Sequence, residues 1–599
     1  MKLTPQTQYV NIPIDSRHYC VHGLIQMCAA TAFYLLRPAS APAFLAFAIA
    51  SAMFAIGCYT FSRHLEVSET LKNLSSTNKF TITKEWIKKF RVNPSTFYLG
   101  KGFLWGTECT QIYHQLINLP LLEKIVNLEP EGGGKIFLHN IGKDKEEQRF
   151  HELPEHTIVA GTTGVGKTQA LKLLVTQIVA NNEAVIVIDP KGDRDFLNSV
   201  YRIAVQAGRK QDFQFFSLLH PESSGTFDLF GDCIKASEVA DRMKSVIADT
   251  GASDTTDPFL AFCWTLIHAT ADLLLATRQK ITPARIYRSL VIDNKELYSH
   301  GENMLRRSSA LAEQETLQSA LEVYKAKIVD HPEEHASKMT SVLVPMLTIL
   351  GKGETGKLLS PEVANLQIAD IINNKRIVYI NLASMSYQRE SATIGKLIVQ
   401  NIVGHIGKEY GYSRQLKGVH LVVDEFYSVA YPGYIEMLNK ARAAGLHLYL
   451  GMQTSADIAA TLGPVGVEQV LGNTNNYIIL RIPEAFFAEV VAARCGKTVA
   501  PQKVKTRSIN AGMDRYDHLF RSGHAERMDM VEVERISPET LNSLPKGEAF
   551  FISGGKPPIK LALPMLAESG EYIESFFELL NPEQAFAMGN MDNSEAQMV

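Results

Sequence analysis

Residues 161–168 form a loop whose composition suits the binding of phosphate groups. They read GTTGVGKT and fit the pattern G-x-x-x-x-G-K-[S/T]. The run 156–160 (HTIVA) before the loop is rich in β-forming residues, and residues 169–180 after it carry apolar side chains at helical spacing. A strand, a glycine-rich loop and a helix in this order predict a nucleoside triphosphate site, but they leave the use of that nucleotide open.

Each residue type in the loop has its own task in this chemistry. Gly161, Gly164 and Gly166 let the backbone curl so that N–H groups point at the phosphates, assisted by the partial positive charge of the helix N-terminus. The Lys167 ammonium is expected to reach the β- and γ-phosphates, and the Thr168 hydroxyl to bind Mg²⁺. The residues expected to hold ATP are Gly161, Thr162, Thr163, Gly164, Val165, Gly166, Lys167 and Thr168.

A pair of carboxylates follows another apolar run far downstream. Residues 419–423 (VHLVV) predict a buried strand that delivers Asp424 and Glu425 at its end. Asp424 is the expected second ligand of Mg²⁺, and Glu425 is the expected base that orients and deprotonates the attacking water. Neighbouring side chains on a strand point to opposite sides, which would separate the two roles. Taken alone, the pair also fits a solvated surface turn.

Two further side chains are candidates for sensing the nucleotide. Residues 446–452 (LHLYLGM) predict a strand beside the Asp-Glu strand, and Gln453 at its tip could contact the γ-phosphate and report its loss. Arg442 is predicted on a helix, one turn before Gly445, from which it could stabilise charge at the nucleotide of a neighbouring subunit. A solvated cation favoured by the helix dipole is the alternative for Arg442.

The elements around these residues predict an α/β core. Residues 184–189 (AVIVID) and 376–382 (RIVYINL) are apolar runs typical of strands that helices cover on both faces. The turn after residue 189 ends with Asp193 and fits either a functional or a solvated loop. A GTPase switch is disfavoured because no N-K-x-D segment is present, and residues 374–377 (NKRI) come nearest to one.

Composition sets further limits on the chain. At 599 residues it is too long for one compact core, so two to four structural units are expected. Its formal net charge of -3 argues against a general basic coat, so any contact with nucleic acid should be local. Seven cysteines without CxxC spacing indicate a reducing compartment, with neither a disulfide framework nor a zinc site.

Two long apolar stretches near the N-terminus predict a membrane hairpin. Residues 19–36 and 43–61 are each about one bilayer thickness of helix, and the turn between them is short enough to force antiparallel packing. Residues 62–101 carry eight Lys or Arg against three acids, which places both ends of the hairpin in the cytoplasm. A buried helical pair in a soluble core and a signal peptide cut near residues 39–41 are the alternatives. His22 and Gln26 are expected to hydrogen-bond between the helices.

The β pattern stops between about residues 249 and 351, where helical segments take over. Pro258 and Pro283 are each placed to open a helix. From residue 561 onward the chain has seven acids and no Lys or Arg, and residues 572–580 (YIESFFELL) read as an amphipathic acidic segment. This tail could dock a basic protein partner or form a solvated terminal helix.

In this order, the membrane hairpin, GTTGVGKT, VIVIDPKGD, LVVDE and a Gln after the next strand resemble the coupling proteins of type IV secretion and conjugation. YLGKGFLW at residues 98–105 is similar to the TraD branch of integrative conjugative elements. The resemblance spans roughly residues 15–560. Two features depart from near relatives: Gly164 stands where Arg is frequent, and FDLFGD at residues 227–232 replaces an Asn-Pro turn.

The resemblance implies a fold and a set of parts. The fold would be a RecA-like P-loop ATPase core, related to FtsK and HerA, with an inserted all-α domain and an N-terminal two-helix transmembrane hairpin. Lys167, Asp424, Glu425, Gln453 and Arg442 would form the catalytic set, with Thr168 and Asp424 on Mg²⁺. The expected parts are the hairpin (1–65), a basic linker with the start of the cytoplasmic region (66–150), nucleotide-binding segments (151–248 and 356–560), the all-α domain (249–355) and the acidic tail (561–599).

The function implied by the resemblance is a motor at the bacterial inner membrane. A homo-hexamer would bind single-stranded DNA without sequence preference and drive a relaxase-bound strand towards the inner-membrane components of a type IV secretion channel. A double-stranded DNA translocase of the FtsK kind is the first alternative, disfavoured by the two spans and the lack of a recognisable C-terminal winged helix. The second alternative is a docking platform that nucleotide merely stabilises.

Overall fold

The computed structural model describes most of the chain. The described residues are 16–36, 42–74, 78–83, 96–117, 132–153, 155–248, 258–332, 340–412, 416, 418–510, 521–567 and 575–580. They fall into two compact units. The larger unit comprises Thr81–Leu99, Phe150–Ile479 and Met565–Val599, and the smaller comprises Met1–Phe80, Gly100–Arg149 and Leu480–Pro564.

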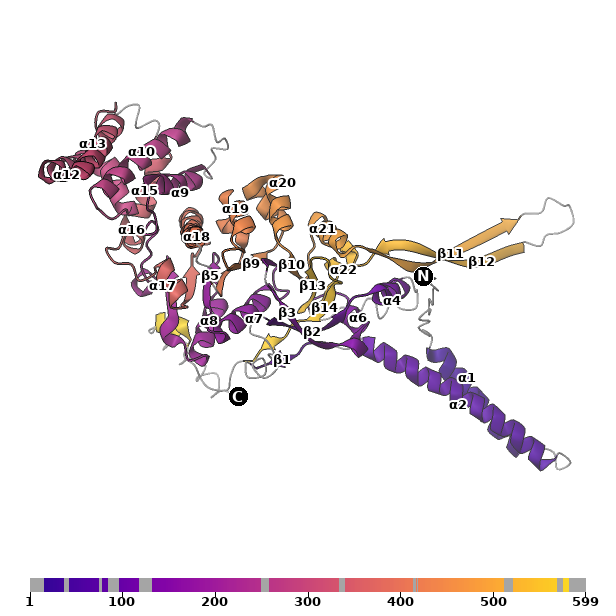
Figure 1. The fold of residues 1–599 in the computed structure, drawn as a ribbon. Helices are drawn as coiled ribbons and strands as arrows, with labels where there is room; N and C mark the ends of the chain where they lie inside the picture. The colour runs from indigo at the N-terminus through magenta and orange to yellow at the C-terminus, as the bar shows by residue number, and fades with distance from the viewer. Residues whose placement is uncertain are drawn as a thin grey trace, which may run out of the picture. The chain divides into compact units, whose positions relative to one another are not determined.

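A parallel sheet forms the centre of the larger unit (Figure 1). Its strand order is β10-β4-β9-β8-β5-β7-β6. The strands are β4 (Thr157–Ala160), β5 (Ala184–Asp189), β6 (Phe213–Ser217), β7 (Ile377–Asn381), β8 (Val419–Val423), β9 (Leu446–Met452) and β10 (Asn476–Ile479). All their described neighbours pair in parallel, so every carboxyl end faces the same edge of the sheet.

The sheet has helices on both faces, as its apolar strands predict. Figure 1 shows α7 and α8 on one face and α18, α19 and α20 on the other. These helices are α7 (Lys167–Ala180), α8 (Arg194–Gln206), α18 (Gln388–Gly411), α19 (Gly433–Lys440) and α20 (Ser455–Asn473). Strands β4, β5, β7, β8 and β9 appear within one residue of their predicted positions.

The inserted helical domain occupies the middle of the chain, where the β pattern stops. Its helices are α9 (Ala236–Ala248), α10 (Pro258–Ala276), α11 (Pro283–Tyr287), α12 (Asn294–Arg307), α13 (Leu311–Tyr324), α15 (Leu343–Gly351) and α16 (Gly353–Leu359), with π-helical turns η5 (Arg288–Ile292) and η6 (Lys325–Val329). As predicted, α10 and α11 open at Pro258 and Pro283, and the Thr282 hydroxyl accepts the Arg285 N–H at 3.2 Å. Asp232 joins the base of the domain to α18 through ion-paired Arg242 at 2.5 Å and Asn401 at 2.8 Å.

The smaller unit combines stretches that are far apart in sequence. Strand β14 (Ile559–Ala562) pairs antiparallel with β13 (Glu548–Ser553) and with residues 101–104 of β2 (Thr96–Leu104). Its other elements are β3 (Glu147–Glu152, through Arg149), α4 (Thr107–Ile117), α6 (Phe137–Asn140), α21 (Ala485–Cys495), α22 (Pro538–Asn542) and the antiparallel ribbon of β11 (Lys497–Asn510) with β12 (Arg521–Glu534). The expected boundaries, with a basic linker and the start of the cytoplasmic region at 66–150 and a nucleotide-binding segment at 356–560, stay a prediction.

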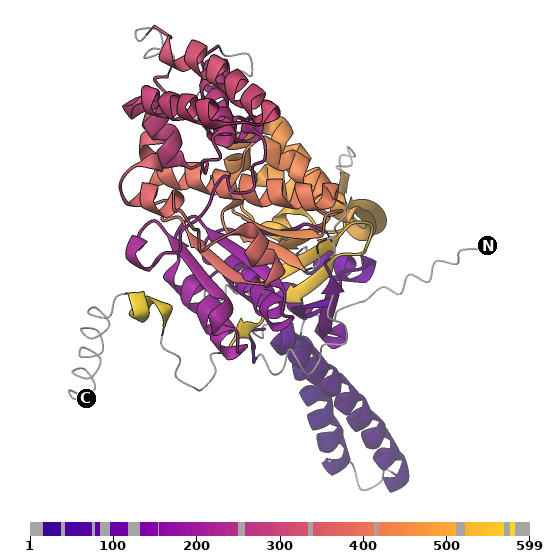
Figure 2. The same cartoon turned by 60° about the vertical axis from the view of Figure 1, so that its left-hand side comes forward.

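The N-terminal hairpin consists of α1 (Ser16–Leu35) and α2 (Ala43–Leu74), which pack side by side (Figure 2). Residues Ala43–Leu65 have a mean hydropathy of 1.9 and suffice to cross a membrane, and Tyr19–Leu35 form a shorter apolar helix. Gly23 and Gly57 lie at the contact, where a methyl group on Gly57 would approach Met27 to 2.7 Å. The predicted hydrogen bonding is present at Gln26, whose side-chain oxygen accepts from the Thr60 hydroxyl at 3.4 Å.

The acidic tail lies mostly outside the described residues. Within the larger unit, β15 (Met565–Leu566) pairs with β1 (Thr81–Ile82), and the short helix α23 (Phe576–Leu580) packs on α8. The Phe576 ring lies 4.9 to 5.1 Å from the rings of Tyr201, Phe213 and Phe215. This part of the tail therefore packs on its own chain through the aromatic contacts of Phe576.

The helix that follows the phosphate loop is anchored by one buried amide. The Tyr98 N–H donates to Gln177 Oε1 at 2.7 Å, and Gln177 Nε2 donates to the Tyr98 carbonyl at 3.1 Å. Gln177→Leu should lower the melting temperature by about 4 °C or more, because two buried backbone groups lose their partners. Gln318→Leu on the exposed face of α13 is the control and should melt like wild type. Equal melting temperatures of both variants would contradict this account.

Candidate functional site

The phosphate loop lies between β4 and the N-terminus of α7, as its sequence context predicts. The Gly161 N–H donates to the Met452 carbonyl at 3.1 Å, which ties the start of the loop to the end of β9. Gly164 and Gly166 have φ values of +76° and +116°, in the left-handed region that favours glycine. Gly166 also caps α7, so the loop passes directly into the helix whose N-terminus faces the phosphate site.

Lys167 and Asp424 form an ion pair across the site. Lys167 Nζ lies 3.0 Å from Asp424 Oδ1, and the side chains are 8% and 12% exposed. Thr168 follows Lys167 in the first turn of α7, so the Thr168 hydroxyl lies on the same helical turn as Lys167. A carboxylate and a hydroxyl are oxygen donors of the kind that Mg²⁺ takes, and the ammonium suits phosphate. These residues therefore fit Mg²⁺ and a nucleoside triphosphate.

Glu425 owes its position to an unusual backbone conformation. Strand β8 ends at Val423, so Asp424 and Glu425 lie in the following turn and not on the strand. Glu425 has φ 57° and ψ 60°, a left-handed conformation that costs a non-glycine residue free energy, and its N–H donates to Asp424 Oδ1 at 3.1 Å. Asp424 and Glu425 therefore leave the chain from a turn, so the strand alternation that was expected to separate them does not apply.

Gln453 reaches the same place from the neighbouring strand. Strand β9 lies between β4 and β8, and Gln453 follows its last residue. Gln453 Nε2 donates to Glu425 Oε1 at 2.8 Å. The carboxyl edge of the sheet therefore brings together Lys167, Asp424, Glu425 and Gln453, four of the five predicted catalytic residues.

Asp189, at the end of β5, was missed in the sequence. Its carboxylate accepts three backbone N–H groups at 2.6 to 3.0 Å and the Tyr379 hydroxyl at 2.6 Å. Burial, with a smaller contribution from the charge of Asp424, raises the pKa of Asp189 to about 6 in spite of these hydrogen bonds. The Asp193 carboxylate caps α8 by accepting two backbone N–H groups, so the turn after β5 has a structural role. The sequence signal that could have identified Asp189 is an acidic residue at the end of an apolar strand.

Arg442 lies away from the other four residues. Helix α19 ends at Lys440, so Arg442 lies in the turn before β9 and not on the helix, as its spacing from Gly445 had suggested. Its guanidinium pairs with Glu155 at 2.9 Å and is half exposed. Glu155 precedes β4, so both residues lie at the amino edge of the sheet, about 13 Å or more from the loop at the other end of that strand. Arg442 therefore has no place at the nucleotide of its own subunit.

Gly451 on β9 leaves the space that Asp424 fills. A methyl group at this position would lie 2.8 Å from Asp424 Oδ1 and 3.1 Å from the Val423 carbonyl. Gly451→Ala should displace the carboxylate and weaken Mg²⁺-dependent binding of an ATP analogue about tenfold or more. Gly472→Ala on α20 has open space around its methyl group and should bind like wild type. Titration of a fluorescent analogue with and without Mg²⁺ measures both, and equal affinities would contradict the steric role.

Two coupling proteins and a VirB4 protein are similar to this chain. The type 4 coupling protein DotL of Legionella pneumophila subsp. pneumophila is 21% identical over 465 residues, which cover 67% of this chain and 57% of DotL. Plasmid coupling protein TrwB in complex with a non-hydrolysable ATP analogue is 14% identical, covers 70% of this chain and 87% of its own, and superposes with a TM-score of 0.48. VirB4 of Thermoanaerobacter pseudethanolicus is 12% identical, with coverages of 69% and 89% and a TM-score of 0.40.

One family match carries the assignment. The type IV secretion-system coupling protein DNA-binding domain family matches residues 150–564, well over half of the chain. The matched range contains the phosphate loop, both carboxylates, Gln453 and the inserted helical domain. The chain therefore belongs to the family of type IV secretion-system coupling proteins.

Proposed function

We propose that this protein is an ATP-driven motor that moves a DNA strand towards a type IV secretion channel during conjugative transfer. The observation that carries the proposal is the convergence of Lys167, Asp424, Glu425 and Gln453 at one sheet edge. Family membership supports DNA as the molecule that is moved, because the matching domain is described as DNA-binding. The apolar N-terminal helices support anchorage in the bacterial inner membrane.

Each residue has a role that its position supports. On binding Mg²⁺ and ATP, Lys167 would leave Asp424 for the phosphates, and Asp424 would turn to the metal together with Thr168. Glu425 would orient the attacking water and accept its proton. Because Gln453 holds the Glu425 carboxylate, a change at the γ-phosphate would reach both residues together.

The assembly and its partners follow from the proposed activity. In a homo-hexamer, any action of Arg442 on a nucleotide would be on that of a neighbouring subunit, since Arg442 lies at the opposite edge of the sheet from its own loop. The DNA would be single-stranded, bound through its backbone without sequence preference and delivered with a relaxase. An FtsK-like motor for double-stranded DNA and a nucleotide-stabilised docking platform are the competing functions.

ATP turnover separates a motor from a platform. The full-length protein in detergent should hydrolyse ATP faster when single-stranded DNA is added. Lys167→Ala should abolish turnover, and Glu425→Gln should lower it at least about a hundredfold while ATP still binds, because the general base is lost. Tight ATP binding without turnover in the wild type would support the platform, and stimulation by double-stranded DNA alone would support the FtsK-like motor.

Mixed assemblies test whether Arg442 acts on a neighbouring subunit. Arg442→Ala and Lys167→Ala proteins should each be inactive but regain part of the turnover when mixed, because an intact loop then meets an intact arginine. Glu155→Gln is the matched control, since it breaks the 2.9 Å pair and keeps the arginine. That variant should stay active alone. Mixtures without any recovered turnover would count against a role in trans.

A further inference from the structure

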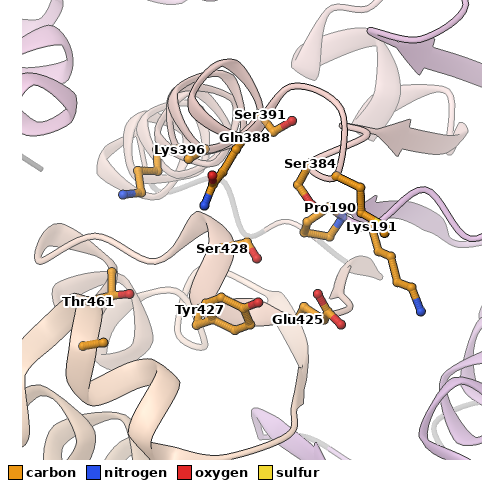
Figure 3. Close-up of a pocket in the computed structure, with 13 residues that line it drawn as sticks. Pro190, Lys191, Ser384, Gln388, Ser391, Lys396, Glu425, Tyr427, Ser428 and Thr461 are labelled. Atoms are coloured by element: carbon orange, nitrogen blue, oxygen red, sulfur yellow. The ribbon is translucent and has the colours of Figure 1, made fainter. Parts of the chain in front are cut away.

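A cavity of about 710 Å³ opens beside Glu425 at the carboxyl edge of the sheet. Its wall includes the loops after β5 and β7, the first turns of α18, the 3-10 turn η7 (Phe426–Val429) and α20. Figure 3 shows Lys396 and Lys191 at opposite ends, with Gln388, Tyr427 and Ser428 between them. The cavity thus presents a row of hydrogen-bond donors that begins and ends with a cation.

The charge balance of the lining favours an anion. Among the lining residues that the structure describes, Glu425 is the only carboxylate, and it already accepts a hydrogen bond from Gln453. Lys191 and Lys396 bring two positive charges against this one negative charge. Side chains of Ser384, Gln388, Tyr427, Ser428 and Thr461 add polar groups that can donate to phosphate oxygens.

Lys396 is the most informative residue in the wall. It lies on one face of α18 with Gln388, Ser391 and Ala392, and it is 6% exposed. Burial lowers the pKa of its ammonium to about 8, because a cation away from water is disfavoured. An anion in the cavity would add a favourable charge interaction with this ammonium.

The start of α18 adds to the same potential. This helix has 24 residues, and its first turn lines the cavity at Gln388 and Ser391. Tyr387, the residue before it, makes no side-chain hydrogen bond to the helix end. The backbone N–H groups of a first turn carry partial positive charge, which adds to that of the lysines.

We propose that this cavity binds the phosphates of a single-stranded nucleic acid, with Lys191 and Lys396 as its two ends. The inference rests on the proposed motor function and identifies where the motor holds its strand. A strand fits better than a lone phosphate group because the two cations lie apart, and a phosphodiester backbone supplies one charge after another. Tyr427 between them offers a ring on which a base can stack.

The position of the cavity links the strand to ATP turnover. Glu425, the proposed base, stands in its wall, and Asp424 next to it pairs with Lys167. A phosphate beside Glu425 repels the carboxylate and changes the strength of the hydrogen bond that Gln453 donates to it. The strand therefore acts on the reacting groups through direct contact and not through a distant rearrangement.

DNA affinity of the full-length protein tests the two lysines. A fluorescent oligothymidylate is titrated in detergent with a non-hydrolysable ATP analogue, at several salt concentrations. Lys191→Gln combined with Lys396→Gln should weaken binding about tenfold, and the slope of log K against log salt should flatten by about 0.7 per lysine. Lys396→Arg should keep most of the affinity, because the charge remains.

The control removes an exposed lysine elsewhere. Lys357 on α16 pairs with Glu354 at 2.8 Å and does not line the cavity, so Lys357→Gln should bind DNA like wild type. Equal melting temperatures show that the lysine variants fold. Unchanged DNA affinity in the double variant would overturn this site while leaving the motor in place. Weaker binding of the ATP analogue with unchanged DNA affinity would assign the cavity to a neighbour's nucleotide, which also overturns the proposal.

A cross-link locates the strand directly. Met385 lines the cavity and is 83% exposed, so benzoylphenylalanine at this position should cross-link the oligonucleotide upon irradiation. Val363, which is 80% exposed and lies outside the lining, is the control position. A yield at 385 well above that at 363 supports the site, and equal yields contradict it. A wild type that binds no DNA in either assay would overturn the motor and the site together.

Discussion

The order of three parallel strands governs the whole site. Because β9 lies between β4 and β8, the phosphate loop, Gln453 and the Asp424–Glu425 turn all lie at the same edge of the sheet. Some 290 residues of sequence separate the phosphate loop from Gln453. Each strand is completely buried or nearly so, which leaves little freedom to shift its register. The geometry of the candidate site is thus a property of the sheet, and the loops need only small adjustments.

Backbone detail supplies those adjustments. Gly451 leaves room for Asp424, and the left-handed turn at Glu425 moves its carboxylate beside Gln453. The Lys167–Asp424 pair means that neither buried charge stands alone before nucleotide binds. In the proposed mechanism, Mg²⁺ and ATP would separate this pair, so that each side chain would exchange one charged partner for another.

Local signals explain what the sequence could predict. The phosphate loop, five core strands, the apolar N-terminal helices and the helices at Pro258 and Pro283 all carry periodic or turn signals within a short window. The left-handed Glu425 carries none, because no residue type there requires it. Strand β14 and its pairing with β2 also give no local sequence signal, because the paired residues are more than 450 positions apart. Arg442 was placed on a helix because a glycine three residues later resembled a helix end.

Helix α10 shows that hydropathy alone does not identify a membrane helix in this chain. Its mean hydropathy of 1.7 is close to the 1.9 of Ala43–Leu65, yet half of it is buried inside the helical domain, where it packs on α9 and α13. A count of apolar stretches would therefore include a helix whose apolar side chains already have partners in the folded protein.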